Sequence, residues 1–278
     1  MYKHFGLREN QRNVNPAPPE ILSAPGLAGA APAPRSLQLD ELRQRCAKPG
    51  WKLDRNTSVF YSKQPFGRCA EQFRTLRSRL YRLQRTQPIR TLLITSALPG
   101  EGKTFVALNL AQAIACQHER RALLIDADLR ASRLHVAMGA SSAPGIADYL
   151  RGEADEFSII QGDSQDNLFL IPPGNRVSDP AELLANIRLK SLLDRLAPLF
   201  DWIIVDAPPV LPVSDASVLG GLCDAVILVV RAASTAFDVA QTACQEFQER
   251  NLVGVVLNRA EEEASYGAYY YSSNGKDK

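Results

Sequence analysis

The residues best suited to chemistry lie between Ser96 and Thr104, in the segment Ser-Ala-Leu-Pro-Gly-Glu-Gly-Lys-Thr. Gly100 and Gly102 let the backbone curl so that successive N–H groups face one anion, and a helix starting after Lys103 adds its positive N-terminal dipole. Lys103 would neutralise the outer phosphates of a nucleotide, and the Thr104 hydroxyl would ligate Mg²⁺. Because an apolar run precedes this segment and a helical pattern follows it, the sequence predicts a phosphate-binding loop (P-loop).

We expect the whole loop to contact the nucleotide. Ala97 stands where the usual pattern has its first glycine, and Phe105 stands where a second hydroxyl often lies near the α-phosphate. The hydrogen bond lost at Phe105 is worth a net ~1 kcal/mol, so we expect a weaker affinity with the chemistry retained. The predicted ATP-binding residues are Ala97, Pro99, Gly100, Glu101, Gly102, Lys103, Thr104 and Phe105.

Carboxylates follow two further apolar runs. Asp206 comes directly after residues 202–205, where it either holds the magnesium ion through water or simply caps a loop. Asp126 and Asp128 follow residues 122–125 at i and i+2, and they point the same way if the strand pleat continues. One of this pair can ligate the metal while the other accepts a proton, and we prefer Asp126 as the base. The predicted catalytic residues are Lys103, Asp126, Asp128 and Asp206, and the predicted metal ligands are Thr104, Asp128 and Asp206.

Short apolar runs alternate with helical patterns along the chain. The runs are nearly continuous in Val, Ile and Leu, which is typical of parallel strands buried on both faces. This alternation predicts an α/β fold: a doubly wound, mainly parallel sheet of P-loop NTPase type with helices on both faces, which binds ligands at the carboxyl ends of its strands. The expected strands are 91–95, 122–125, 168–171, 202–205, 225–230 and 252–257, and the expected helices are 104–115, 145–150, 181–196, 214–222 and 236–250.

Composition excludes several classes of protein. The 32 basic and 30 acidic side chains give a charge of +2, which argues against a nucleic-acid binder. Five scattered cysteines without a Cys-x-x-Cys pair favour neither a zinc or iron–sulfur site nor a disulfide scaffold. The apolar runs are far shorter than the ~20 residues that cross a bilayer. We therefore expect a cytoplasmic protein with reduced thiols.

The chain divides into four expected parts. Residues 1–35 form a flexible Pro-rich arm, and residues 36–64 form a short helical or irregular lead-in. Residues 65–260 form the P-loop domain, and residues 261–278 form a disordered tail rich in tyrosine. Residues 36–42 have the pattern of a short amphipathic helix, which either packs on the core or contacts a partner.

Three segments resemble the Walker A, A′ and B motifs of the bacterial tyrosine kinases (BY-kinases) of the CpsD/CapB type. They are residues 96–104, 123–130 and 203–209, within a resemblance that covers roughly residues 65–260 and the tail. The A′ motif is the most specific, with an apolar triplet before Asp126-x-Asp128-x-Arg130. The related deviant-Walker ATPases of the MinD/ParA group carry a lysine at the position of Leu98, so this residue favours the kinases. After Arg130 the sequence lacks the proline that these kinases usually show.

A second resemblance lies upstream. Glu71, Arg74 and Arg77 match the Glu-x-x-Arg-x-x-Arg motif that BY-kinases use to assemble rings. On a helix these residues lie on neighbouring positions and can pair with carboxylates of another subunit. Two alternatives stay open, namely a solvated basic face with weak local ion pairs and a contact with phosphate or anionic lipid.

The tail carries four of the eight tyrosines, at Tyr266, Tyr269, Tyr270 and Tyr271. The resemblance implies an autophosphorylation cluster, and the alternative is an aromatic anchor in a groove. Eleven residues from Ala260 span at most ~36 Å, close to the ~40 Å diameter expected of the domain, so phosphorylation within one chain or between chains is feasible. The resemblance favours transfer between chains. Each phosphotyrosine adds about −1.5 to −2 charges, which we expect to favour ring dissociation.

The resemblance implies an ATP- and Mg²⁺-dependent protein-tyrosine autokinase that regulates exopolysaccharide or capsule synthesis or export. Without a spanning segment, the chain is expected to be recruited to the inner face of the plasma membrane by a separate transmembrane polysaccharide co-polymerase that activates it. A cognate tyrosine phosphatase is a further expected partner. The alternatives are a MinD/ParA-like ATPase switch for positioning or partitioning and a non-catalytic scaffold. Asp215 either faces the site or caps a helix.

Overall fold

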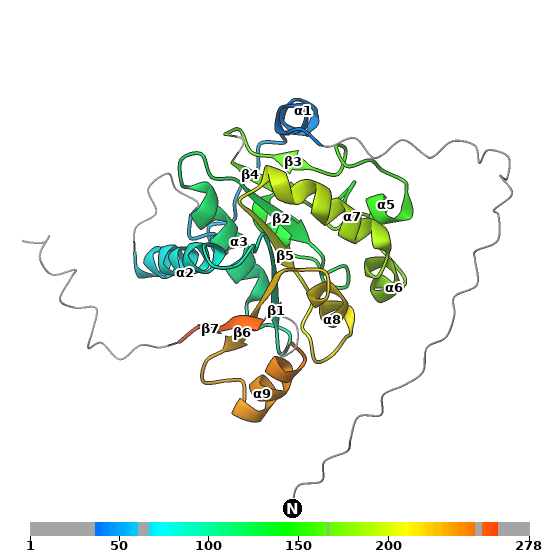
Figure 1. Ribbon diagram of the computed structural model, residues 1–278. Coiled ribbons are helices and arrows are strands. Elements are labelled where there is room, and N and C mark those ends of the chain that lie inside the picture. Colours follow the sequence, from blue (N-terminus) through cyan, green and yellow to red (C-terminus); the bar gives the residue numbers. More distant parts are fainter. Residues whose placement is uncertain (1–36, 61–66, 166, 248–251, 261–278) are drawn as a thin grey trace, which may run out of the picture. The chain divides into compact units, whose positions relative to one another are not determined.

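The computed structural model describes residues 37–60, 67–165, 167–247 and 252–260 (Figure 1). Its strands form one sheet in the order β3-β4-β2-β5-β1-β6-β7. All neighbouring strands run parallel except β3 and β4. The strands are β1 (Thr91–Ser96), β2 (Ala122–Asp126), β3 (Gln161–Gly162), β4 (Leu168–Ile171), β5 (Trp202–Asp206), β6 (Ala225–Arg231) and β7 (Leu252–Asn258).

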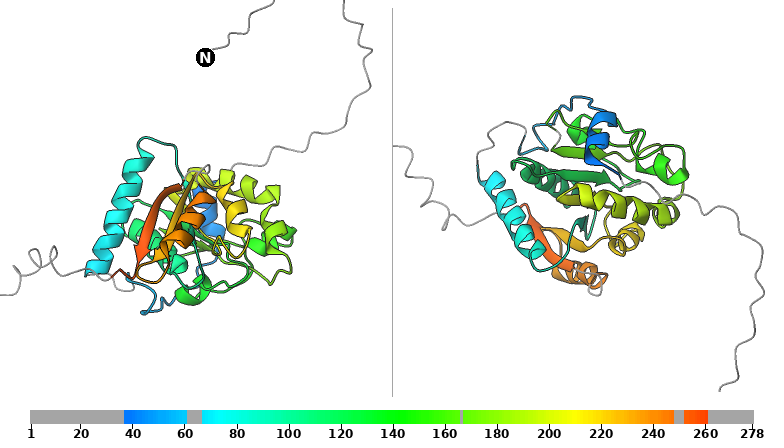
Figure 2. Two further views of the ribbon diagram at one scale, coloured as in Figure 1. Left: turned by 90° about the horizontal axis from the view of Figure 1, so that it is seen from below. Right: turned by 45° about the horizontal axis from the view of Figure 1, so that its top comes forward.

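Helices cover both faces of the sheet (Figures 1 and 2). The first face is covered by α2 (Arg68–Gln84), α3 (Lys103–Ala115) and α4 (Leu134–Met138). The second face is covered by α1 (Leu39–Arg45), α5 (Ile146–Arg151), α6 (Pro180–Leu184), α7 (Ile187–Leu196), α8 (Asp215–Gly220) and α9 (Phe237–Gln245), with a short 3₁₀ turn at Ala197–Leu199.

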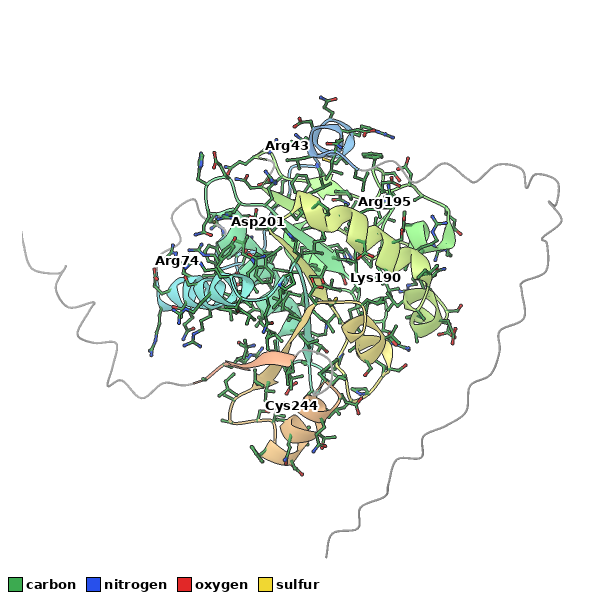
Figure 3. The ribbon with its side chains drawn as sticks, in the orientation of Figure 1. Arg43, Arg74, Lys190, Arg195, Asp201 and Cys244 are labelled. Carbon is green, nitrogen blue, oxygen red and sulfur yellow. The ribbon has the colours of Figure 1, made fainter. Side chains whose placement is uncertain are left out.

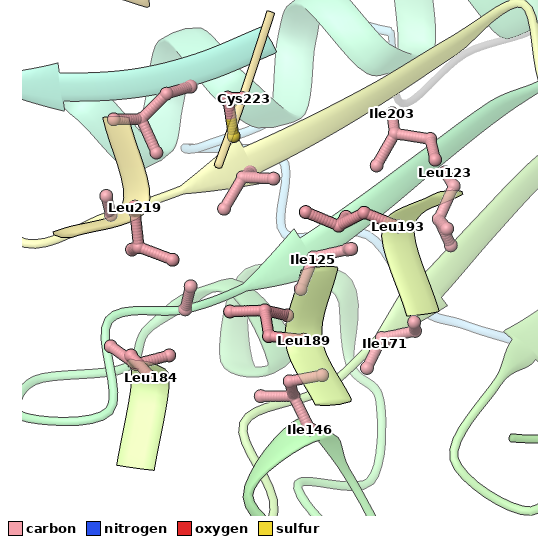
Figure 4. Packing of buried hydrophobic residues seen from close by; sticks show 14 of the residues in the cluster. Leu123, Ile125, Ile146, Ile171, Leu184, Leu189, Leu193, Ile203, Leu219 and Cys223 are labelled. Carbon is pink, nitrogen blue, oxygen red and sulfur yellow. The ribbon is translucent and has the colours of Figure 1, made fainter. Parts of the chain in front are cut away.

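The strands are buried along their length because each supplies both cores. Successive side chains of a strand point to opposite faces. Leu92 and Ile94 of β1 therefore pack under α3, and Leu93 between them packs on the opposite face. Figure 4 shows leucines of α7, including Leu189 and Leu193, against the second face. This double burial explains why the strands are nearly continuous in aliphatic residues.

The predicted doubly wound, mainly parallel α/β sheet is confirmed. Every expected strand is present and ends within one residue of its predicted limit. The single helix expected over 181–196 is wrong: α6 ends at Leu184 and α7 begins at Ile187. Asn186 adopts an extended conformation between them, and its side chain accepts a 2.9 Å hydrogen bond from the Arg188 N–H. Such N-capping favours a new helix start over a continuous helix.

The lead-in packs on the domain. Leu42 of α1 is fully buried in the second core, and Phe60 lies in the first core beside Phe73. An isolated parallel bridge also joins Ala47 to Gln161. The predicted arm and tail lie outside the described residues, and the boundary at residue 65 stays a prediction. Within the described ranges, no helix combines the length and apolarity needed to cross a membrane.

Candidate active site

The predicted site residues meet at the carboxyl ends of three adjacent strands. Strand β5 lies between β1 and β2, and its register places Asp206 opposite Ile94 on one side and Asp126 on the other. The Ala127 N–H donates to the Asp206 carbonyl at 2.9 Å, so β2 and β5 stay hydrogen-bonded up to their carboxyl ends. The parallel sheet thus brings together segments about 80 residues apart.

The loop between β1 and α3 has the backbone that phosphate binding requires. Gly100 and Gly102 have φ values of 81° and 99°, in the left-handed region that favours glycine. No acidic residue lies in the first turn of α3, so its N-terminal N–H groups and dipole are available to an anion. The Glu101 carbonyl accepts a 2.7 Å hydrogen bond from Asn258 Nδ2, which holds the loop against the end of β7.

Gly102 is required for space as well as for conformation. A Cβ atom there would lie 2.0 Å from Asn258 Nδ2, whereas a Cβ at Gly100 would meet nothing within 4 Å. We expect Gly100→Ala to lower the free energy of unfolding by about 1 kcal/mol through backbone strain alone, and Gly102→Ala to lower it further. Urea unfolding of the nucleotide-free protein measures both. The excess cost at Gly102 should vanish in an Asn258→Ala background, and its persistence there would contradict this assignment.

Lys103 and Thr104 are already engaged with the acidic residues. Lys103 Nζ lies 2.7 Å from Asp128 Oδ2 and 3.9 Å from Asp206 Oδ1, and the Thr104 hydroxyl donates to Asp206 Oδ2 at 2.7 Å. Burial alone would lower the pKa of Lys103, but the charges of Asp206 and Asp128 outweigh it and raise the pKa. Lys103 is therefore a partly buried cation held by carboxylates next to the phosphate loop.

The three carboxylates are buried at one place. Asp126 and Asp206 are fully inaccessible, and Asp128 is 2% exposed. Burial raises the pKa of Asp206 to about 7, although Lys103 opposes the shift. Burial also raises the pKa of Asp126, and the nearby charge of Asp128 adds to the effect. The single charge of Lys103 therefore leaves excess negative charge here, which a second cation would relieve.

The residues present fit Mg²⁺ in company with a nucleotide. Asp126 Oδ1 and Asp206 Oδ1 are buried acceptors without a hydrogen-bond partner among the described residues. The same part of the chain contains no group of three or more His, Cys, Asp or Glu side chains that would hold a metal by itself. Magnesium is commonly bound through one or two carboxylates, water and substrate phosphates, so this donor set suits a Mg²⁺–nucleotide rather than a bare ion.

Several of the residues predicted to bind the nucleotide make contacts within the protein instead. The Glu101 side chain is 3% exposed and accepts from the Leu98 N–H at 2.7 Å and from the Thr235 hydroxyl, so it braces the loop. The Phe105 ring packs 5.8 Å from the Phe73 ring and joins α3 to α2. Ala97 is buried, whereas Pro99 and Gly100 are exposed on the loop.

Three residues that contribute to the site were not among the predicted site residues. Arg130 of the A′ motif forms an ion pair with Asp215 through two hydrogen bonds of 2.8 and 2.9 Å. Of the two roles considered for Asp215, the structure therefore places its side chain towards the site, where it pairs with Arg130. His135 Nδ1 lies 3.9 Å from Asp126 Oδ2. Asn258 lies over the loop as described. The A′ arginine was a usable signal for the first, but neither His135 nor Asn258 has a local pattern.

The three residues of the Glu71–Arg77 motif make different contacts. Glu71 and Arg74 form an ion pair with each other along α2, where Figure 3 labels Arg74. Arg77 instead donates to the Ala113 carbonyl of α3. Ring assembly through these residues stays a prediction. The tail tyrosines lie outside the described residues.

Known proteins are similar to this chain in both sequence and architecture. The family model described as "AAA domain" matches residues 90–251. Tyrosine-protein kinase YwqD of Bacillus subtilis is 31% identical over 229 residues, which cover 81% of this chain and 95% of YwqD. Tyrosine-protein kinase Etk of Escherichia coli is 32% identical over 260 residues, which cover 91% of this chain. The chain spans about a third of the length of Etk and of the Wzc relatives.

Solved structures agree with these relatives. The kinase domain of Escherichia coli tyrosine kinase ETK superposes with a TM-score of 0.64 at 34% identity, over 71% of this chain and 80% of that domain. MinD of Pyrococcus horikoshii, complexed with Mg-ADP, gives a TM-score of 0.53 at 23% identity over 62% of this chain and 72% of MinD, which shows a shared fold alone. Together with the P-loop, the buried A′ aspartates and Asp206, these likenesses show that the chain belongs to the family of ATP-binding bacterial tyrosine-protein kinases.

Proposed function

We propose that this chain is a protein-tyrosine autokinase that transfers the γ-phosphoryl group of ATP to its own C-terminal tyrosines. The observation that carries the proposal is the position of Lys103 between Asp128, at 2.7 Å, and Asp206, at 3.9 Å, with the Thr104 hydroxyl 2.7 Å from Asp206, all beside the phosphate loop. Phosphoryl transfer needs positioning and charge neutralisation more than covalent participation of the protein, and this group supplies both.

The loop amides and Lys103 hold the β- and γ-phosphates in the proposed mechanism. To reach them, Lys103 exchanges its contact with Asp128 for a phosphate oxygen, which frees the Asp128 carboxylate. Thr104, Asp206 and Asp128 would hold Mg²⁺, which supplies neutralisation of the charge that builds up on the phosphates. The hydrogen bond from Thr104 to Asp206 shows that these two oxygens already lie close enough to share one ion.

Asp126 is the proposed base for the incoming tyrosine hydroxyl. Its raised pKa brings it nearer to neutral pH, where a base transfers a proton most effectively. Its Oδ2 atom accepts a 3.2 Å hydrogen bond from the Leu134 N–H, which fixes the carboxylate, while Oδ1 has no hydrogen-bond partner among the described residues. Arg130, held by Asp215, anchors the loop that carries Asp128.

We further propose that transfer occurs between subunits of a ring assembled through Glu71, Arg74 and Arg77. Tail phosphorylation would then favour ring dissociation. By family resemblance the activity regulates exopolysaccharide or capsule synthesis or export, with a transmembrane co-polymerase as activator at the inner face of the plasma membrane and a tyrosine phosphatase that resets the cycle. Residues 1–35, 36–64, 65–260 and 261–278 are the proposed arm, lead-in, kinase domain and tail.

Incubation of the purified full chain with Mg-ATP, followed by phosphotyrosine immunoblotting, tests this function. We expect a strong signal that falls at least 10-fold when Tyr266, Tyr269, Tyr270 and Tyr271 are all changed to Phe, because the acceptors are gone. Tyr149→Phe, at a buried position, is the matched control and should leave the signal unchanged. ATP hydrolysis without phosphotyrosine would instead support the ATPase switch.

A further inference from the structure

A basic groove lies at the amino ends of the strands, on the side of the domain opposite the P-loop. It has a volume of about 530 Å³ and is formed by the C-terminal half of α2 and the segment after α3. Gln84 Nε2 donates to the carbonyls of Ile89 and Asp201, which precede β1 and β5, and this places the groove at the amino ends of the strands. Its lining residues are Arg77, Ser78, Tyr81, Arg82, Gln84, Arg85, Gln117 and Arg120.

The charge of this groove is incompletely balanced. Arg120 lies 2.6 Å from Asp201 Oδ1 (Asp201 is labelled in Figure 3) and over the Tyr81 ring. Arg82 and Arg85 are exposed, and within the described part of the chain no ion pair or side-chain hydrogen bond engages them. The lining contains four arginines and no acidic residue. A groove of this kind attracts an anion with several oxygens, because guanidinium groups pair with phosphate in two-bond geometry.

Buried hydrogen-bond donors in the walls of the groove also favour an anionic ligand. Arg77 Nε and Tyr81 Oη are hydrogen-bond donors without a partner among the described residues, although both atoms are buried. Buried groups of this kind are normally satisfied by protein, water or a ligand. A favourable helix dipole would explain cations at the C-terminus of α2, but it leaves these two donors unexplained. Burial also lowers the pKa of Arg77, and a bound anion would offset that cost.

We propose that the groove binds phosphotyrosine of the C-terminal tail, from the same chain or a second copy. The inference rests on the proposed autokinase activity, which supplies that ligand. Residues 261–278 carry Glu261, Glu262 and Glu263 beside the tyrosine cluster, so the phosphorylated tail is strongly anionic and complements the arginines. A concave site lined by arginine and without lysine suits a single inserted side chain better than a planar lipid surface.

The tail can reach the groove. It leaves from β7, which lies beside α2 in both views of Figure 2. The strand is seven residues long, so the way from its carboxyl end to the amino edge is about 23 Å, and two strand spacings from β7 to β1 add about 10 Å. The ~36 Å span from Ala260 to Tyr271 covers this path.

Occupation of the groove links phosphorylation to assembly. Arg77 belongs both to the groove and to the Glu71–Arg77 motif proposed to assemble rings. A phosphotyrosine bound by Arg77 therefore competes with subunit contacts made through the same side chain. This competition is a physical route from tail phosphorylation to ring dissociation.

Fluorescence anisotropy with a synthetic peptide of residues 260–278, phosphorylated on Tyr269, Tyr270 and Tyr271, tests the groove. The binding partner is the full chain with its four tail tyrosines changed to Phe, without ATP, at about 0.15 M salt. We expect the phosphopeptide to bind at least 10-fold more tightly than the unphosphorylated peptide. Arg82→Glu and Arg85→Glu should each weaken phosphopeptide binding at least 10-fold.

The matched control is Arg79→Glu, an exposed arginine on the same helix that does not line the groove. It should change the affinity less than threefold, and an equal loss there would overturn the proposal in favour of general charge attraction. Inorganic phosphate should compete at least 100-fold more weakly than the phosphopeptide, and equal competition would overturn it as well.

A third arm uses phosphatidylserine–phosphatidylcholine vesicles. Loss of vesicle binding in Arg82→Glu with unchanged phosphopeptide binding would assign the groove to the membrane and refute our proposal. Because the peptide is synthetic, the binding result is independent of kinase activity. A chain that binds the phosphopeptide without making phosphotyrosine would therefore refute the proposed function alone.

Discussion

Changing Lys103 to Met is expected to abolish tyrosine phosphorylation, with a loss of at least about 10³-fold in rate, in the range found when a cation that neutralises transferred phosphate is removed. Methionine keeps the length of the stem but cannot donate or carry charge. The nucleotide phosphates would then face the carboxylates of Asp128 and Asp206 without the ammonium group that now lies 2.7 and 3.9 Å from them. Phosphotyrosine immunoblotting and a rate measurement with labelled ATP give the loss.

Two further variants make this result interpretable. Lys190→Met on α7 removes an exposed lysine that pairs with Asp194 far from the phosphate loop, and it should leave the rate unchanged (Lys190 is labelled in Figure 3). Lys103→Arg keeps the positive charge and is expected to fold. The planar guanidinium cannot occupy the ammonium position, so the rate should still fall by more than 10-fold. A purified Lys103→Met protein that is folded by circular dichroism and fully active would refute the assignment.

Changing Asp206 to Asn is expected to reduce activity and raise stability at the same time. The rate should fall on the order of 100-fold, as for groups that hold a metal through water. The free energy of unfolding should increase above pH 7, because the variant no longer buries an ionised carboxylate beside Asp126 and Asp128. A change of about 1 kcal/mol corresponds to ~2–4 °C in Tm for a domain of this size, and we expect at least that shift.

The pH dependence of this gain has a defined sign. The pKa of Asp206 is raised to about 7 in the folded chain from its ordinary value of 3.8, so the folded state holds more protons than the unfolded state between about pH 4 and 7. Stability of the parent protein therefore falls as pH rises through this window. Lys103, Thr104, Asp126 and Asp128 face the same carboxylate and remain in the variant.

Thermal unfolding of the nucleotide-free protein in the presence of a chelator measures the effect. The parent and Asp206→Asn should have nearly equal Tm values near pH 4, and the variant should become progressively more stable than the parent as the pH rises to about 7, with the full difference present at pH 8. Asp194→Asn, at an exposed carboxylate, is the matched control and should shift Tm by less than 1–2 °C at either pH. A variant less stable than the parent at pH 8 would contradict the burial argument.

Local patterns in the sequence were sufficient for most of the fold. A strand buried on both faces must be apolar at consecutive positions, and this makes β1, β2, β5 and β6 visible without any contact information. The P-loop was equally visible, because Gly100 and Gly102 are needed for their own backbone angles. The break between α6 and α7 could not be predicted, because the sequence on both sides has a helical pattern. The break depends on the hydrogen bond that the Asn186 side chain accepts from the Arg188 N–H.

Residue types and spacing along the chain determined the family, the parallel sheet, the phosphate loop and the set of acidic residues. Only the tertiary structure decided that Arg130 pairs with Asp215, that Asn258 fills the space over Gly102, and that Arg77 faces a groove with Arg82, Arg85 and Arg120. These contacts join segments up to 157 residues apart. A backbone angle or a buried strand constrains its own residues, whereas the partner of a buried charge depends on which strand ends the sheet order places together.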